Sequence, residues 1–122
     1  MKYVRIYADQ NGDSHFEDVE VTMSLTNFAP PAPPVDVSPF MPSTSVGFIG
    51  APAGADSPPH PAPRRQFGFV LTGEAEVAVS DGEVRHFGPG SVVLVEDTSG
   101  KGHTIRNVSN DYVLIAIVQL PD

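Results

Sequence analysis

HPAPRRQFGFVLTG, residues 60–73, is the stretch from which the fold of this chain can be worked out. Its first half is polar, charged and interrupted by prolines. Its second half, from Gln66 to Thr72, is rich in residues that favour strands and ends in a turn at Gly73. A second polar run, GKGH, occupies residues 100–103, with Asn107 behind it. The two polar runs are expected to form facing walls of one pocket.

The rest of the chain consists of short strand-like segments separated by turns. Strands are expected over residues 2–7, 19–26, 45–50, 75–80, 83–87, 91–96, 103–108 and 112–120. Asp81-Gly82 is a two-residue hairpin signal, and Gly88-Pro89-Gly90 marks a further turn. About nine short strands with such turns predict an all-β sandwich or small barrel. The interior of a small barrel is filled by side chains or holds one small ligand.

The proline-rich segment between residues 30 and 42 cannot be a central strand, because proline donates no backbone hydrogen bond. It carries or adjoins several large apolar residues, which linkers seldom contain: Phe28, Val35, Val37, Phe40 and Met41. These residues favour an extended apolar arm laid over a hydrophobic surface. The alternative is an ordinary long loop.

Size and composition indicate one domain over residues 1–122, with N-terminal strands and the arm in 1–45 and the barrel core in 46–120. The net charge of −8 argues against a nucleic-acid partner, since a phosphate backbone would be repelled. The chain has no cysteine, which excludes disulfides and thiolate metal sites. No long apolar run indicates a secretory signal or membrane association, so the cytoplasm is the expected compartment.

The spacing of the two polar runs resembles the paired motifs of the cupin superfamily. In this chain the first motif consists of Gly54, His60, Ala62, Gln66 and Gly73, with five, one, three and six residues between successive positions. The second motif consists of Gly100, His103 and Asn107, with two and three residues between them. The resemblance covers about residues 46 to 120. It is closest to small single-domain cupins that carry His-Pro-Ala-Pro-Arg-Arg-Gln in the first motif. It implies an RmlC-like double-stranded β-helix, a jelly-roll barrel, with the N-terminal strand and proline-rich arm outside the core.

This chain departs from the family pattern at the metal ligands. The family uses His, His and Glu from the first motif and His from the second, whereas this chain has Ala62 and Gln66 at two of these positions, and Thr98 replaces a proline of the second motif. The resemblance therefore implies a site of His60, Gln66 and His103 for a divalent ion such as Zn, Fe, Mn or Ni. An amide oxygen is a weak, uncharged ligand. The alternative is a metal-free polar pocket in which the two histidines make hydrogen bonds.

Arg64 and Arg65 suggest that the ligand is an anion. Simple alternation places Arg64 on the same side as His60 and Gln66, and a register break at the prolines would give that position to Arg65 instead. A guanidinium there would pair with a carboxylate or phosphate. For one of the two arginines we expect a salt bridge to a neighbouring acid, Asp97, Glu96 or Asp56.

Other polar residues are expected to play supporting parts. Asp97 and Lys101 flank His103 and could orient its ring. Asn107 is expected to bond to backbone groups of a turn. His15 is expected to be solvated, and His86 to lie on the outer face.

Three functions fit these observations. The first is an enzyme (an isomerase, lyase, cyclase or dioxygenase) acting on a small anionic or carbonyl-bearing molecule, with His60 and His103 as catalytic residues and Arg64, Arg65 and Gln66 binding substrate. The second is a metal-free barrel that binds a small molecule, with a degenerate metal site. The third is a structural protein with a filled pocket. Whether the chain is an enzyme stays open.

The resemblance also implies a homodimer, and an unpaired strand at residues 2–7 would suit exchange between copies.

Overall fold

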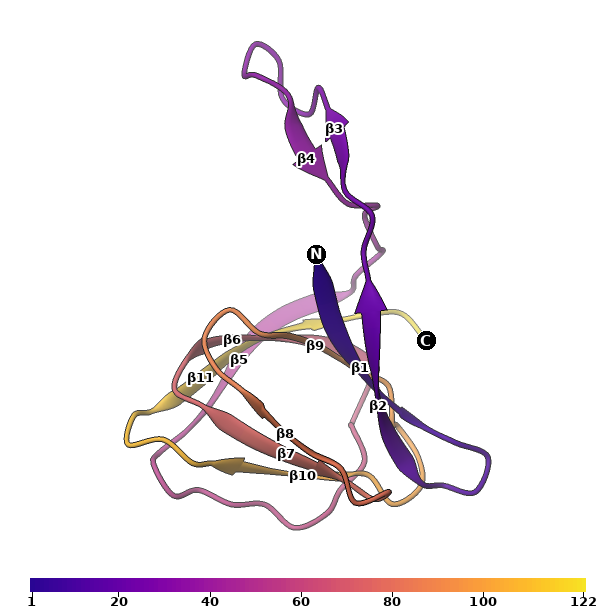
Figure 1. Cartoon of the computed structure of the whole chain (residues 1–122), viewed down its shortest axis with the longest axis vertical. Helices are drawn as coiled ribbons and strands as arrows, with labels where there is room; N and C mark the ends of the chain where they lie inside the picture. The colour runs from indigo at the N-terminus through magenta and orange to yellow at the C-terminus, as the bar shows by residue number, and fades with distance from the viewer.

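The computed structural model describes all residues from 1 to 122 and contains strands, turns and loops but no helix, so it has no membrane-spanning helix. The strands are β1 (Lys2–Ala8), β2 (Ser14–Glu20), β3 (Ser24–Thr26), β4 (Val35–Val37), β5 (Ser45–Ala51), β6 (Gln66–Thr72), β7 (Ala75–Val79), β8 (Val84–Phe87), β9 (Val92–Val95), β10 (His103–Asn107) and β11 (Val113–Gln119). A six-stranded sheet in the order β2-β1-β9-β6-β11-β5 faces a three-stranded sheet in the order β10-β7-β8 (Figure 1). This is the all-β jelly-roll arrangement expected from the sequence.

Alternation of side chains along the strands creates the core between these two sheets. In β7 the buried positions are Ala75, Val77 and Val79, while the residues between them are less buried. The strand turns back into β8 through Asp81-Gly82, where Gly82 has a φ of 101° that suits glycine. Nine buried side chains make one cluster: Ile6, Phe16, Val70, Val77, Val79, Phe87, Val93, Val113 and Ile115.

The N-terminal strand belongs to the barrel and has a partner on each side. β1 pairs antiparallel with β2 and parallel with β9, in a register that sets Val4 opposite Val93. The expectation of an unpaired strand at residues 2–7 is therefore wrong. The pairing also places the N-terminal strands inside the barrel sheet, where Ile6 and Phe16 contribute to the core.

The expected half-buried strand over residues 19–26 is wrong as well, because the chain leaves the sheet within it. β2 ends where Glu20 pairs with Lys2, the first residue of β1, and the chain leaves the sheet after the hydrogen bond from the amide of Val21 to the carbonyl of Met1. The chain then forms β3, and Leu25 is 74% exposed.

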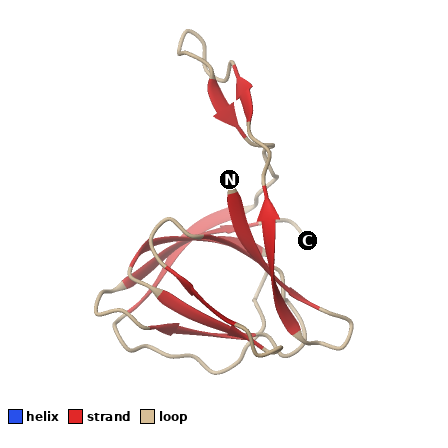
Figure 2. Ribbon diagram, viewed as in Figure 1, coloured by secondary structure: helices blue, strands red, loops and turns tan.

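The proline-rich segment forms an arm, which we define as residues 22–42, and only its end lies on the barrel. β3 and β4 pair with each other as a hairpin that stands away from the two barrel sheets (Figures 1 and 2). The returning chain, from Ser38 to Met41, borders a groove on the outer face of the six-stranded sheet, next to Tyr3 and Phe67. The expected contact with an apolar surface thus exists at the base of the arm but not at its tip.

Candidate functional site

The site is built on a backbone contact between the two polar runs. His60 and His103 form an isolated antiparallel bridge, in which each amide donates a hydrogen bond to the carbonyl of the other at 3.0 Å. Residues paired in this way direct their side chains to the same side of the strands. The two imidazole rings accordingly lie with their centroids 5.0 Å apart.

Each ring is fixed through its Nδ1 atom. Nδ1 of His60 lies 2.8 Å from the carbonyl oxygen of Pro58, which can only accept, so this nitrogen carries the hydrogen. Nδ1 of His103 lies 2.6 Å from Oδ2 of Asp97 and donates to that carboxylate. The Nε2 atoms of both rings make no hydrogen bond within the protein. In the neutral rings, both therefore present lone pairs to a ligand.

The two rings border a cavity of about 120 Å³ between the barrel sheets. They supply its only polar side chains, because its other lining residues are aliphatic, aromatic or glycine. Val70 and Gly68 of β6 contribute one wall, and Val77 of β7 lies on the wall formed by the smaller sheet. The arrangement is an apolar chamber with a pair of imidazoles as its polar feature.

Asp97 is the most buried charged residue of the chain, with no exposed surface. Its backbone carbonyl accepts a hydrogen bond from the amide of Ala62, and its Oδ2 holds His103. Its Oδ1 has no hydrogen-bond partner. The expected orienting role of Asp97 is confirmed, whereas Lys101 instead reaches Asp13, at 2.8 Å. The sequence does not reveal that Asp97 is enclosed, because its neighbours along the chain are polar.

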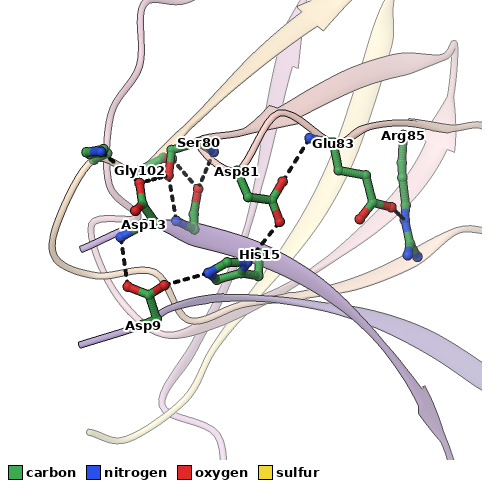
Figure 3. A network of polar contacts seen from close by, with 10 residues as sticks. Asp9, Asp13, His15, Ser80, Asp81, Glu83, Arg85 and Gly102 are labelled. Carbon is green, nitrogen blue, oxygen red and sulfur yellow. Dashed lines mark hydrogen bonds and ion pairs between the residues drawn. The ribbon is translucent and has the colours of Figure 1, made fainter. Parts of the chain in front are cut away.

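The loop before His103 is held by the β1–β2 and β7–β8 turns, as Figure 3 shows. The hydroxyl of Ser14 donates to the carbonyl of Gly102 at 2.6 Å, and Ser14 and Ser80 exchange two further bonds. A Cβ at Gly102 would lie 2.1 Å from the backbone of His60, so only glycine permits this approach. These contacts set the position of His103 relative to His60.

The structure does not bring Gln66 to the two histidines. Its side-chain oxygen accepts a hydrogen bond from the amide of Gln119 at 3.1 Å. Gln66 lines a separate hollow beside β5, and it is absent from the lining of the histidine cavity. Ala62, at the other altered ligand position, is 3% exposed and offers only a methyl group.

Neither arginine of the first motif lines the histidine cavity. Arg65 forms an ion pair with Glu96, which also binds Arg5 at 2.5 Å, so the expected salt bridge for one arginine is confirmed. Burial opposes ionisation of Glu96, but the hydrogen bonds from Arg65 and Arg5 hold the pKa of its carboxyl below the usual value. Arg64 is exposed and forms no ion pair.

The remaining polar candidates have structural partners. Asn107 donates to the carbonyls of Ala51 and Asp111, as expected. His86 is exposed, as expected, and lies between two glutamates. His15 is not simply solvated, because its two ring nitrogens contact Asp9 and Asp81 at 2.7 and 2.8 Å (Figure 3).

Comparison with known proteins identifies the class. The chain matches the Cupin domain family over residues 47–118, more than half of its length, and belongs to that family. A comparison with curated protein sequences gave no match.

Solved structures support the same fold. The Cnp3 cupin domain of Schizosaccharomyces pombe is 19% identical with a TM-score of 0.55, over 89% of this chain and 73% of that one. A Cupin 2 conserved barrel domain protein from Salinispora arenicola is 26% identical with a TM-score of 0.51, over 62% of this chain and 61% of that one. A conserved protein of unknown function from Streptococcus pyogenes is 19% identical with a TM-score of 0.50, over 63% and 64%.

The side chains present do not fit a resident metal. Two imidazoles converge, but Ala62 has no donor atom and the oxygen of Gln66 is bonded to Gln119. No group of three or more His, Asp or Glu side chains is arranged to hold an ion. Catalytic metal sites usually have three firm protein ligands.

Replacement of Gly102 tests the close approach of the two runs. Gly102→Ala should lower the free energy of unfolding by about 1–3 kcal/mol more than Gly82→Ala, because it adds a backbone clash. Gly82 is the matched control: it also has a positive φ, but its Cβ would meet nothing within 4 Å. Urea unfolding of both variants measures the difference. Equal losses would contradict the contact.

The contacts of His15 predict a pH dependence. The hydrogen bond to Asp9 raises the pKa of His15 above its ordinary value, burial opposes this, and the bond to Asp81 adds to it. A raised folded-state pKa stabilises the fold fully below the unfolded value of 6.5, and this contribution is lost as the pH rises through the folded value. The urea midpoint of the native protein should therefore fall between pH 6 and pH 8.5 by more than that of His15→Gln. Identical falls of the urea midpoint in the two proteins would contradict this stabilising role of His15.

Proposed function

We propose that the barrel binds a small, largely apolar acid or carbonyl compound without a resident metal, and that the polar group of the ligand contacts Nε2 of His60 and of His103. The observation that carries the proposal is the pair of unbonded Nε2 atoms at an otherwise apolar cavity. Pockets for small molecules combine mostly apolar walls with a few convergent polar groups in this way.

The size and walls of the cavity limit the ligand. An apolar cavity of about 150 Å³ holds benzene, so the chamber of about 120 Å³ suits a short chain or a small ring. Its walls offer no partner for hydroxyl or amino groups away from the histidines. A sugar or other polyhydroxy compound would leave these groups unbonded, at a cost of about 1–3 kcal/mol each.

An acidic polar group suits the two histidines. Neutral imidazoles accept the hydrogen of an acid at Nε2, and a ring that takes up this proton then donates to the resulting anion. The buried Asp97 carboxylate, 2.6 Å from Nδ1 of His103, accepts the hydrogen of that nitrogen and leaves Nε2 free for the ligand. An acid group can therefore bond to Nε2 of both rings.

The Asp97–His103 contact also supports a second candidate function, proton transfer in catalysis. A carboxylate that holds the tautomer and orientation of a histidine prepares the other ring nitrogen as a base. Nε2 of His103 would remove a proton next to the carbonyl of a ligand, and the same nitrogen would return that proton at another position of the ligand. This is isomerase or lyase chemistry. Its substrates would belong to the same class of compounds as the ligands proposed above.

Binding can be tested with butanoate and benzoate, together with benzene as the apolar reference. In spectra of the uniformly ¹⁵N-labelled protein, both acids should shift the Nε2 signals of His60 and His103. His60→Gln and His103→Gln should each weaken binding about tenfold or more, since hydrogen bonds to charged groups contribute about 1.5–3 kcal/mol. Arg64→Gln is the control, because this side chain does not line the cavity.

Three results would overturn the proposal. The first is that none of the probes moves the two histidine signals. The second is that binding requires added Zn²⁺ or Mn²⁺ and disappears with chelator, which would restore the metal site expected from the sequence. The third is that Arg64→Gln abolishes binding while the histidine variants bind normally, which would move the anion site to the arginine.

A further inference from the structure

A second cavity continues the histidine cavity inside the barrel. Its volume is about 240 Å³, against about 120 Å³ for the histidine cavity. The two cavities share four wall residues: Ile49, Ala75, Ile105 and Ile115. Because these side chains border both spaces, the two cavities are neighbouring parts of one interior.

The strands show the direction in which the second cavity extends. On β10, His103 borders the histidine cavity, Ile105 borders both cavities, and Asn107 borders the second cavity alone. On the adjacent β7, Val77 borders the histidine cavity and Ala75 borders both. A strand advances about 3.3 Å per residue, so the interior extends about 13 Å from His103 to Asn107.

The second cavity offers a ligand no free polar side chain. The side-chain amide of Asn107 bonds to its own turn and to the carbonyl of Ala51, and the hydroxyl of Ser57 exchanges two hydrogen bonds with the backbone of β10. Asp56 lies opposite Arg106 in an antiparallel bridge, and Arg106 is exposed, so the side chain of Asp56 also points outward. The part of a ligand that fills this cavity is therefore a hydrocarbon.

The second cavity reaches the protein surface between the edges of the two sheets. β5 is the last strand of the six-stranded sheet, and residues 54–57 hydrogen-bond to β10 of the smaller sheet. No backbone hydrogen bond joins these two edges. Ile49, which borders the cavity on the β5 side, is 54% exposed. A ligand can thus enter here and reach the histidines from the second cavity.

We propose that the ligand is a linear aliphatic carboxylic acid of about eight to ten carbons, with its acid group at the two histidines and its alkyl tail in the second cavity. The position of the acid group rests on the function proposed above, whereas the tail and its cavity extend that function. An alkyl tail matches a wall without free polar groups, because it leaves none of its own unbonded.

The volumes select the length of the ligand. Pockets for small molecules usually enclose about 300–1,000 Å³. The histidine cavity alone is smaller than this, but the two cavities together enclose about 360 Å³. An apolar cavity of about 150 Å³ holds the six carbons of benzene, so the two together hold about ten to fourteen non-hydrogen atoms. Octanoate and decanoate are acids of this size.

A chain-length series tests the tail. Octanoate should bind at least tenfold more tightly than butanoate, because each buried methylene strengthens binding about threefold to fourfold. Titration calorimetry measures both dissociation constants, with octanoate kept below its micelle concentration. The ratio of the two constants is the readout, since a change at the histidines affects both acids alike.

Filling the second cavity should remove the advantage of octanoate. Ala55→Phe places a ring in this cavity, and Ala75→Leu narrows the passage between the cavities. Each should lower the preference for octanoate over butanoate at least fivefold. Ala78→Leu is the matched control: it makes the same change on β7 but on the outer side of the strand, so the native preference should remain. Thermal unfolding verifies that each variant is folded.

Methyl NMR spectra locate the tail. Octanoate should move the signals of Ala55 and Val113, which border only the second cavity, whereas butanoate should leave them in place. Leu25, 74% exposed on β3, reports non-specific binding of the alkyl chain and should not move.

The outcomes separate the tail from the acid group. If both acids move the Nε2 signals of His60 and His103 but octanoate binds no more tightly than butanoate, the inference about the tail is wrong and the proposed function stands. If octanoate moves Ala55 and Val113 without the two histidines, the proposed function is wrong and only the apolar cavity for the tail is retained.

Discussion

The reciprocal backbone hydrogen bonds between His60 and His103 are the contact on which the rest of the site depends. They join two runs that are far apart in the sequence and put both imidazoles on one side. Gly102 permits the approach, and Ser14 fixes the carbonyl of that glycine. Ser14, at the end of the β1–β2 turn, thus helps to set the position of His103 although it does not line the pocket.

The site combines two bases with a buried acid in place of the ligand set typical of a metal. Removal of one histidine and one carboxylate from the family pattern would leave a cation without a compensating negative charge. Asp97 supplies a negative charge from behind His103, and Ala62 is buried as part of the apolar packing. These positions are the reason that we propose a ligand with its own polar group in place of an ion. The apolar chamber is consistent with that proposal.

Local patterns predicted the strands from β6 to β11, because alternation, Asp81-Gly82 and the glycine turns each act over a few residues. The resemblance of the motif spacing to the cupin pattern also implied that His60 and His103 would meet. It could not reveal that Gln66 would bond to Gln119, since that pairing depends on the register between β6 and β11. Parity alone placed Arg64 inward, but the proline-containing run turns before the strand begins. The end of β2 was missed because it depends on the length of its partner β1.

The parallel pairing of β1 with β9 has a consequence for the order in which the molecule can be completed. Val4 is made about 5–20 seconds before its partner Val93 at ordinary rates of synthesis. During this interval one edge of β1 and the apolar arm are both uncovered, and such surfaces favour aggregation. The prolines of the arm oppose strand addition by neighbouring chains. They would protect the nascent chain while the barrel is still open.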